Sequence, residues 1–296
     1  MIAVSPSPRP EESPSAVRLG LIGDNIGRSR APELHRLAGM IAGVTTTYER
    51  LIPKELGRDF DAVFDYCAAS GYRGVNITYP YKEVAADKVA SQDPRVREIR
   101  AVNTVVFGPH GPEGYNTDYS GFIAAYRAAF GEMPPGDVAM IGAGGVGRAV
   151  AFGLSALAAA SIRIADKDRS KAVGLAQALR GVAPHVEIAV VSDVREALRG
   201  ASGVINCTPV GMVGHEGTPV PASALGSQRW AFDAVYTPVE TTFLHDAAAA
   251  GLKCLSGFEL FFHQGVQAFR IFTGRDVPEG ELRRRLADTS GANRGA

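Results

Sequence analysis

A lysine and an aspartate stand where they could move a proton. Lys82 follows the apolar run GVNIT and a proline, so its ammonium group lies just beyond an expected strand end. Asp118, in NTD, precedes a change in the character of the chain. When a secondary alcohol is oxidised without a metal, a side chain must take the hydroxyl proton. The pair is a candidate for this chemistry, and two unrelated surface charges are the alternative.

The segment Gly142–Gly147 matches the pattern G-x-G-x-x-G. It follows the apolar strand VAMI and opens an alanine-rich helix, which is the context in which the pattern binds a dinucleotide. Gly142 allows the tight turn, Gly144 lets backbone approach the pyrophosphate, and Gly147 lets the helix pack on the strand. The free N–H groups of the helix N-terminus favour phosphate. We predict a dinucleotide site that includes Gly145 and Val146, with a ligand-free turn as the alternative.

Asp166 bears on the choice of dinucleotide. It ends the next strand, SIRIAD, about 20 residues beyond the glycines, as a dinucleotide fold requires. A carboxylate there accepts hydrogen bonds from the ribose of NAD and repels the 2′-phosphate of NADP. Lys167 and Arg169 lie nearby and could partly offset that repulsion. The sequence therefore favours NAD and leaves NADP possible; capping of the following helix is the other role open to Asp166.

Strand-like and helix-like segments alternate along the chain, which implies βαβ units, a mostly parallel sheet and an α/β fold. A length of 296 residues suggests two domains. The expected strands cover residues 17–23, 46–53, 74–79, 186–191, 203–208, 230–236 and 253–257, with a hairpin from 101–108 to 114–115. The expected helices begin near Pro32, cover roughly 54–70, and begin again after Asp118 and near Phe258.

Composition argues against several classes of function. With 31 basic and 31 acidic residues, the formal net charge is zero, which gives no electrostatic case for nucleic acid or an anionic membrane. Cys67, Cys207 and Cys254 are an odd, scattered set, which argues against disulfides and indicates a reducing cytoplasm. No CxxC, HExxH or Cys/His cluster suggests a metal. Residues 1–16, rich in Pro, Ser and Glu, predict a disordered leader.

Eight motifs occur in a fixed order between about Val17 and the closing helix. They are GRSRAPELH, GVNITYPYK, AVNT, NTD, GAGGVGRA, NCTPVGM, DAVYTPVETTFL and GFELFFHQGVQAF. On this set the chain resembles the shikimate/quinate dehydrogenase family. The resemblance implies an α/β substrate-binding domain over 17–118 plus 258–290 and a Rossmann-type NAD(P)-binding domain over 119–257. It also implies reversible hydride transfer between NAD(P) and a ring hydroxyl or ketone of shikimate or quinate.

The resemblance further implies roles for single residues. Lys82 and Asp118 would be catalytic, with Lys82 either as proton shuttle or as electrostatic support. The substrate-binding side chains would be Ser29 and Tyr236 at the carboxylate, and Thr78, Asn103 and Gln264 at ring hydroxyls. A loop near the nicotinamide ribose would contain Asn206, Thr208, Pro209, Gly211 and Met212. A plain strand-to-helix turn would suit the Pro and Gly of that loop equally well.

Three features depart from the family pattern, one of which is that Tyr119 and Ser120 follow NTD where the family often has glycine. The first loop usually offers two hydroxyl groups to the carboxylate, but here Ala31 stands two residues after Ser29. A lost hydrogen bond to a charged group costs about 1.5–3 kcal/mol, unless Arg28, Arg30, water or a turned carboxylate compensates. The Asn-Arg-Thr/Ser of NADP-dependent members is replaced by the segment 166–169, Asp-Lys-Asp-Arg. Together these features favour the NAD-linked quinate/shikimate or aminoshikimate branch.

Three alternatives remain open at this point. The chain could be an NADP-dependent biosynthetic shikimate dehydrogenase, a ligand-binding member of the fold without turnover, or an oxidoreductase for an unrelated small acid. In each case the expected partner is a small molecule, without nucleic acid, membrane or metal. We expect a cytoplasmic monomer or homodimer.

Overall fold

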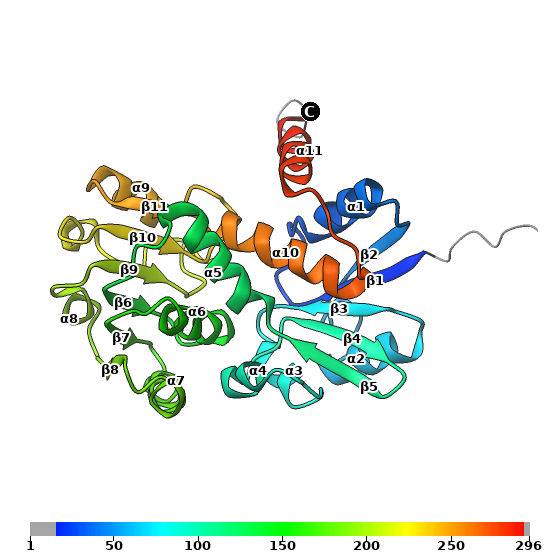
Figure 1. Ribbon diagram of the computed structural model, residues 1–296, viewed down its shortest axis with the longest axis horizontal. Coiled ribbons are helices and arrows are strands. Elements are labelled where there is room, and N and C mark those ends of the chain that lie inside the picture. The colour runs from blue at the N-terminus through cyan, green and yellow to red at the C-terminus, as the bar shows by residue number, and fades with distance from the viewer. Residues whose placement is uncertain (1–15, 293–296) are drawn as a thin grey trace, which may run out of the picture.

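Two β-sheets with surrounding helices make up the computed structural model, which describes residues 16–292 (Figure 1). The predicted leader therefore lies almost wholly outside the described residues. The first sheet has the order β2-β1-β3-β4-β5. Its strands are β1 (Val17–Ile22), β2 (Thr46–Leu51), β3 (Gly74–Ile77), β4 (Thr104–Gly108) and β5 (Gly111–Tyr115). The first three are parallel, and the last two form the antiparallel hairpin expected from the sequence.

Four helices accompany the first sheet. They are α1 (Ala31–Ala42), α2 (Phe60–Ala69), α3 (Lys82–Ala86) and α4 (Pro94–Ile99). The helix expected over 54–70 begins only at Phe60, because residues 53–58 form turns and the Asp59 side chain accepts the Ala62 N–H at 2.8 Å. The short helix α3 begins next to the position where the sequence indicated a helix after the proline, whereas α4 was not expected.

The second sheet has six parallel strands in the order β11-β10-β9-β6-β7-β8. They are β6 (Asp137–Ile141), β7 (Ser161–Ala165), β8 (Glu187–Val190), β9 (Gly203–Asn206), β10 (Trp230–Asp233) and β11 (Lys253–Leu255). Its helices are α6 (Gly145–Ala156), α7 (Arg169–Val182), α8 (Val194–Leu198) and α9 (Thr242–Ala249). The strand order is that of a dinucleotide-binding fold, so the Rossmann-type prediction is confirmed. The order reverses between β6 and β9, where ligands of such sheets bind.

Two long helices join the sheets. α5 (Thr117–Phe130) and α10 (Gly257–Thr273) pack side by side between them (Figure 1). The pair is close because Gly121 has no side chain: a methyl group there would lie 2.9 Å from the Gln264 backbone nitrogen. Phe122 and Tyr126 of α5 belong to the core of the second sheet, whereas Phe262 of α10 packs with α1. The chain thus crosses between the two units at α5 and returns at α10.

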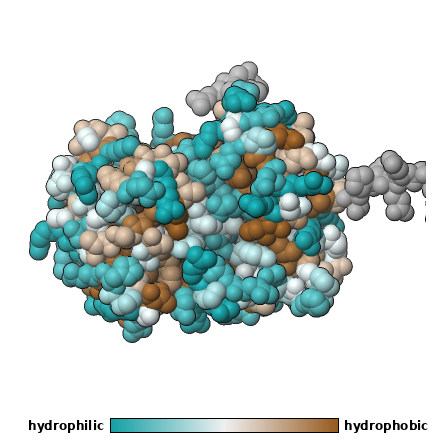
Figure 2. Space-filling view, viewed as in Figure 1, coloured by the Kyte–Doolittle hydropathy of each residue, from teal (hydrophilic) through white to brown (hydrophobic). Residues whose placement is uncertain are grey.

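The C-terminal helix α11 (Glu279–Ala292) packs against α1, and its Arg283 forms two 2.9 Å hydrogen bonds with Glu259 of α10. Figure 2 shows a face on which hydrophobic residues form small groups among hydrophilic ones. Within residues 16–292, no helix is both long and apolar enough to pass through a membrane.

Several strands end earlier than expected. The segments 74–79, 203–208 and 230–236 leave their sheets after Ile77, Asn206 and Asp233. The residues that follow these ends turn into the space between the sheets. The predicted strands were too long because strand-like sequence continues beyond the sheet into segments that line a cavity.

Candidate active site

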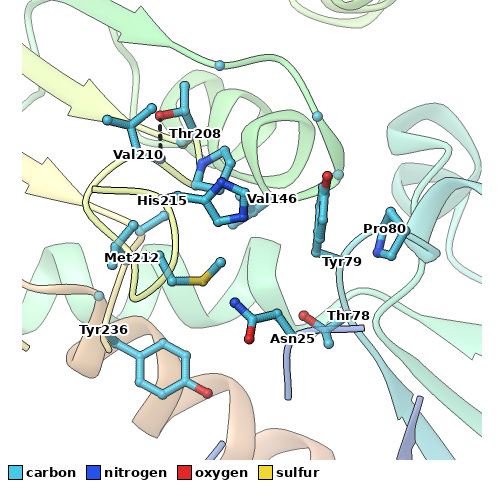
Figure 3. A pocket seen from close by; sticks show the side chains of 18 of the residues that line it. Asn25, Thr78, Tyr79, Pro80, Val146, Thr208, Val210, Met212, His215 and Tyr236 are labelled. Carbon is cyan, nitrogen blue, oxygen red and sulfur yellow. Dashed lines mark hydrogen bonds between the residues drawn. The ribbon is translucent and has the colours of Figure 1, made fainter. Parts of the chain in front are cut away.

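A cavity of about 1390 Å³ lies between the carboxyl ends of the two sheets. Its walls come from segments that follow β1 and β3 of the first sheet and β6, β7, β9 and β10 of the second. In Figure 3, Thr78 and Tyr79 come from one side, and Val146 and Met212 from the other. The segments singled out for substrate and for cofactor therefore share one cavity.

Lys82 and Asp118 form an ion pair in this cavity. The Lys82 Nζ lies 2.6 Å from the Asp118 Oδ2, and the side chains are only 14% and 7% exposed. Lys82 is the first residue of α3, and Asp118 lies in the first turn of α5, where the Asn116 side chain accepts the Tyr119 N–H. The alternative of two unrelated surface charges is wrong. A largely buried pair at a ligand cavity can receive and return a proton.

Beside this pair lies a cluster of amide and hydroxyl groups. The Asn103 carboxamide oxygen accepts the Thr117 N–H at 2.7 Å, and its amide nitrogen donates to the Thr117 Oγ1 at 3.0 Å. The Gln264 Oε1 lies 3.4 Å from that nitrogen, while the Gln264 amide donates to the Phe261 carbonyl. Asn103, Gln264 and Thr78 line the cavity. The cluster offers oriented donors and acceptors to a polyhydroxylated ligand.

Ser29 and Tyr236 meet at another corner of the cavity. Their hydroxyl oxygens are 3.3 Å apart, and the Arg50 guanidinium donates to the Ser29 carbonyl at 2.7 Å, which fixes the loop. The Tyr236 ring stacks on Phe261 with centroids 4.7 Å apart. Burial raises the pKa of Tyr236, so this phenol remains a hydrogen-bond donor at neutral pH. The two hydroxyl groups can both donate to one carboxylate.

The two arginines that flank Ser29 have different positions. The Arg30 guanidinium pairs with Glu33 at 2.9 Å and donates to the Leu286 carbonyl and the Thr289 hydroxyl of α11. Arg30 is not among the residues that line the cavity, whereas Arg28 and Ala31 are. Arg30 is therefore not placed to bind the substrate carboxylate in place of the missing hydroxyl group. Of the two arginines, only Arg28 remains a candidate for that contact.

The glycine turn after β6 has the features that a dinucleotide requires. Gly142 has φ +101°, and a methyl group there would meet the Cys207 carbonyl carbon at 2.7 Å. Gly147 packs directly against the Gly142 carbonyl, so the helix can start close to the strand. Nothing lies within 4 Å of the space that a methyl group on Gly144 would fill. The cavity is thus open at the position where backbone must approach phosphate, and the free N–H groups of α6 face it.

Asp166 supports the same turn. Its Oδ2 accepts the Ala143 N–H at 2.6 Å and its Oδ1 accepts the Asp168 N–H at 2.8 Å. Capping of α7 is not its role, since Asp168 is the N-cap and accepts the Ser170 N–H at 3.0 Å. Asp166 lines the cavity together with Lys167 and Lys171, while Arg169 does not. Asp168 lines the cavity as well, so the group that binds here meets two carboxylates and two lysines at this end.

The loop after β9 divides into a buried anchor and an exposed surface. Thr208, Pro209 and Met212 line the cavity, whereas Asn206 is fully buried and does not. The Asn206 amide donates to the Val210 carbonyl at 3.0 Å, and its oxygen accepts the Thr208 N–H at 2.9 Å. Asn206 therefore fixes the conformation of the loop by buried hydrogen bonds. Thr208, Pro209 and Met212 are the residues of this set that can contact a ligand directly.

Sequence reasoning missed one buried carboxylate behind this loop. Asp233 accepts from Thr241 at 2.6 Å, from the Asn206 amide at 2.9 Å and from the Val235 N–H at 3.0 Å. Burial raises the pKa of Asp233 to about 6, against the opposing effect of these hydrogen bonds. Asp233 and Thr241 lie within the motif DAVYTPVETTFL, so a signal was present. No group of three or more potential metal ligands occurs among residues 16–292.

Comparison with known proteins identifies the family. The quinate/shikimate dehydrogenase (NAD(+)) of Corynebacterium efficiens is 37% identical over 274 residues, which cover 90% of this chain and 96% of that protein. The chain belongs to the shikimate/quinate dehydrogenase family. The shikimate dehydrogenase (NADP(+)) of Halorubrum lacusprofundi is 38% identical over 265 residues, or 88% of this chain and 94% of that protein.

Family models and solved structures agree with this assignment to the shikimate/quinate dehydrogenases. The shikimate dehydrogenase substrate binding domain matches residues 21–105, and the shikimate 5′-dehydrogenase C-terminal domain matches residues 257–286. Quinate dehydrogenase from Corynebacterium glutamicum in complex with NAD superposes with a TM-score of 0.83 at 34% identity, covering 92% of this chain and 99% of that one. Shikimate 5-dehydrogenase from Thermus thermophilus, in complex with NADP(H) and shikimate, gives 0.78 at 31% identity, covering 91% and 99%.

Proposed function

We propose that this protein is a dehydrogenase that interconverts a ring hydroxyl and a ring ketone of shikimate or quinate, with NAD preferred over NADP. The observation that carries the proposal is the 2.6 Å contact between Lys82 and Asp118. The pair lies in a cavity that also contains the glycine turn and the amide cluster around Asn103. Relatives that share about a third of the sequence across the whole fold are named for this reaction.

Lys82 and Asp118 manage the proton in this proposal. In the oxidation direction, the substrate O–H proton passes to the pair as the same carbon loses a hydride; in the reduction direction, the pair returns a proton to the ketone oxygen. When bound, NAD supplies the hydride acceptor. The ion pair fixes the Lys82 Nζ, so little ordering is needed when the substrate arrives.

Substrate orientation is assigned to two groups of side chains. Ser29 and Tyr236 donate hydrogen bonds to the substrate carboxylate. Their hydroxyl oxygens lie 3.3 Å apart, so both can reach the same group. Thr78, Asn103 and Gln264 bind ring hydroxyls. Because Thr117 holds the Asn103 carboxamide on both sides, that group is already oriented before the substrate binds.

Cofactor binding is assigned to the second unit. The proposed contacts are Gly142, Gly144, Gly145, Val146, Gly147, Asp166, Thr208, Pro209 and Met212, with Asn206 acting through the loop that it shapes. The Asp166 carboxylate favours the ribose hydroxyls of NAD. Lys167 and Lys171 line the same end of the cavity, which keeps NADP as the second candidate. The domain division proposed from the sequence places residues 119–257 around the cofactor and 17–118 with 258–290 around the substrate.

Two further assignments complete the proposal. All three cysteines are free thiols, and we assign the enzyme to the cytoplasm, where such thiols remain reduced. We retain a monomer or a homodimer as the expected oligomeric state, to be measured by light scattering.

The proposal is tested by mixing purified protein with NAD and one of several acids and recording the formation of reduced nicotinamide. The panel contains shikimate, quinate, aminoshikimate and non-cyclic hydroxy acids. Turnover of a cyclic acid supports the proposal. Preferential turnover of a non-cyclic acid, or no turnover together with tight binding of NAD and shikimate, would replace it with one of the alternatives.

A further inference from the structure

Gly145, in the cofactor turn, lies directly against the stem of Lys82. A methyl group on Gly145 would be 2.9 Å from the Lys82 Cβ, 3.2 Å from its Cδ and 3.5 Å from its Cγ. Carbon atoms in protein interiors pack at about 3.5–4.0 Å, so the first two distances are too short. The dinucleotide pattern explains Gly142, Gly144 and Gly147 but places no demand on Gly145.

The backbone does not require glycine at position 145. Gly145 is the first residue of α6 and is not among the described residues with positive φ. Alanine is a better helix former than glycine, so a side chain here would suit the helix itself. The three atoms nearest to a methyl group at this position all belong to Lys82. Glycine at this position therefore serves the contact between the two units.

The Lys82 stem has little freedom to move away. Its Cβ is attached to a backbone whose carbonyl accepts the Val102 N–H at 2.8 Å. On the other side, Arg148 of α6 donates to the Ile99 carbonyl at the end of α4. This hydrogen bond holds α6 against α4, which ends three residues before the Val102 that binds the Lys82 carbonyl, and the Lys82 Nζ is held by Asp118.

We infer that Gly145 is a positioning residue for the acid–base pair. The absence of a side chain at Gly145 lets the Lys82 stem cross the cofactor turn, and this path places the Nζ beside Asp118. The kinetic consequence rests on the proposed function, because it requires that Lys82 takes part in turnover. The positional consequence does not, and it can be measured separately.

The kinetic test is a double-mutant cycle with Gly145→Ala and Lys82→Gly, because alanine at position 82 would keep the Cβ that lies nearest to Gly145. We expect Gly145→Ala to lower kcat about 10- to 100-fold, the effect of a displacement of about 1 Å at a reacting group. In the Lys82→Gly background the same change should lower kcat less than twofold, because the whole Lys82 side chain, including the Cβ that lies nearest to position 145, is gone. Equal losses in the two backgrounds, or no loss in the first, would overturn the inference.

Two controls separate positioning from damage to the fold or to the cofactor site. Gly174→Ala, on the exposed face of α7 with nothing within 4 Å, should leave kcat unchanged. The Kd for NAD, measured by fluorescence titration, should change less than threefold in Gly145→Ala. A large rise in this Kd with an unchanged kcat at saturating NAD would assign Gly145 to cofactor binding alone and overturn the inference.

The positional test requires no turnover. Purified protein without NAD is treated briefly with acetic anhydride, and acetylation of each lysine is measured by peptide mass spectrometry. Relative to exposed Lys54, Lys82 should react several-fold faster in Gly145→Ala than in the unaltered protein, since the ion pair with Asp118 is disturbed. An unchanged ratio would overturn the inference. Failure of the unaltered protein to oxidise any acid would count against the proposed function and leave this result standing.

Discussion

The Lys82 Nζ lies 2.6 Å from the Asp118 Oδ2, although 36 positions separate the two residues in the chain. Each residue lies in the first turn of a different helix, α3 or α5, and both side chains are largely buried. The contact therefore depends on how the first sheet and the connecting helix α5 are packed. Loss of either partner would leave the other charge uncompensated in a buried position.

Lys82→Ala should reduce kcat by about 100-fold or more, because a positioned acid–base group contributes this much. NAD binding, measured by fluorescence titration, should remain close to that of the unaltered protein. Lys88→Ala is the matched control, since Lys88 lies just beyond α3, pairs with Asp61 and Asp65, and does not line the cavity. An unchanged kcat with a raised KM in Lys82→Ala would make Lys82 a binding residue only.

Ala31→Ser should restore a second hydroxyl group to the carboxylate corner. Ala31 lines the cavity two positions from Ser29, whose Oγ accepts the Ala31 N–H at 3.3 Å. A hydrogen bond to a charged group is worth about 1.5–3 kcal/mol, so KM for shikimate should fall by about tenfold or more. Quinate carries an extra hydroxyl on the same carbon and should gain less. If Ala31→Ser leaves the KM for both acids unchanged, Arg28 or water already binds the carboxylate in the unaltered protein.

Asp166→Asn should weaken the preference for NAD. The amide oxygen can still accept the Ala143 N–H of the glycine turn, while the negative charge and the hydrogen bond from the Asp168 N–H are removed. The ratio of kcat/KM for NAD to that for NADP should fall about tenfold, because repulsion of the 2′-phosphate is relieved. Asp193→Asn, which keeps the cap of α8 and removes a carboxylate that does not line the cavity, is the control and should change the ratio much less. The same ratio in both variants would remove the ribose role of Asp166.

The sequence predicted well those parts of the site that are specified by short sequence motifs. The glycine turn and the Lys82–Asp118 pair were both found from motifs whose chemistry is carried by a few neighbouring residues, whereas three of the strands end two or three residues earlier than predicted. The direction of the Arg30 side chain was not predictable, because two of its three partners are on α11, 256 and 259 positions away. The inward orientation of Asn206 depends on Asp233 from the next strand, and an alternating strand pattern does not specify such a partner. The need for glycine at 145 was hidden for the same reason, since its neighbour Lys82 belongs to the other unit.

Stability should fall in acid partly because of His35. This side chain is 1% exposed, its Nδ1 has no hydrogen-bond partner among the described residues, and burial lowers its pKa to about 3. Below pH 6.5, the ordinary pKa of histidine, His35 binds a proton in the unfolded chain but stays neutral in the folded protein until the pH falls to about 3. The free energy of unfolding should therefore fall by about 1.4 kcal/mol per pH unit between pH 6.5 and 3 from this residue.

Urea unfolding of His35→Leu at several pH values isolates this contribution. The ring of His35 is stacked on Tyr48 and packed against Phe269 and Phe272, none of which titrates between pH 3 and 6.5. The variant should show a shallower decline of stability below pH 6.5 than the unaltered protein, whatever its stability at neutral pH. Parallel declines in the two proteins would mean that His35 is not the source.

The most direct test of the central proposal is steady-state kinetics with shikimate and quinate, each paired with NAD and with NADP. We predict that kcat/KM is highest with NAD for at least one of the two acids, as expected from Asp166 at the ribose end and Lys82–Asp118 at the reacting end. High values only with shikimate and NADP would contradict the assignment of NAD through Asp166 and would indicate the NADP-dependent biosynthetic enzyme. No turnover in any of the four combinations would contradict the proposed reaction itself.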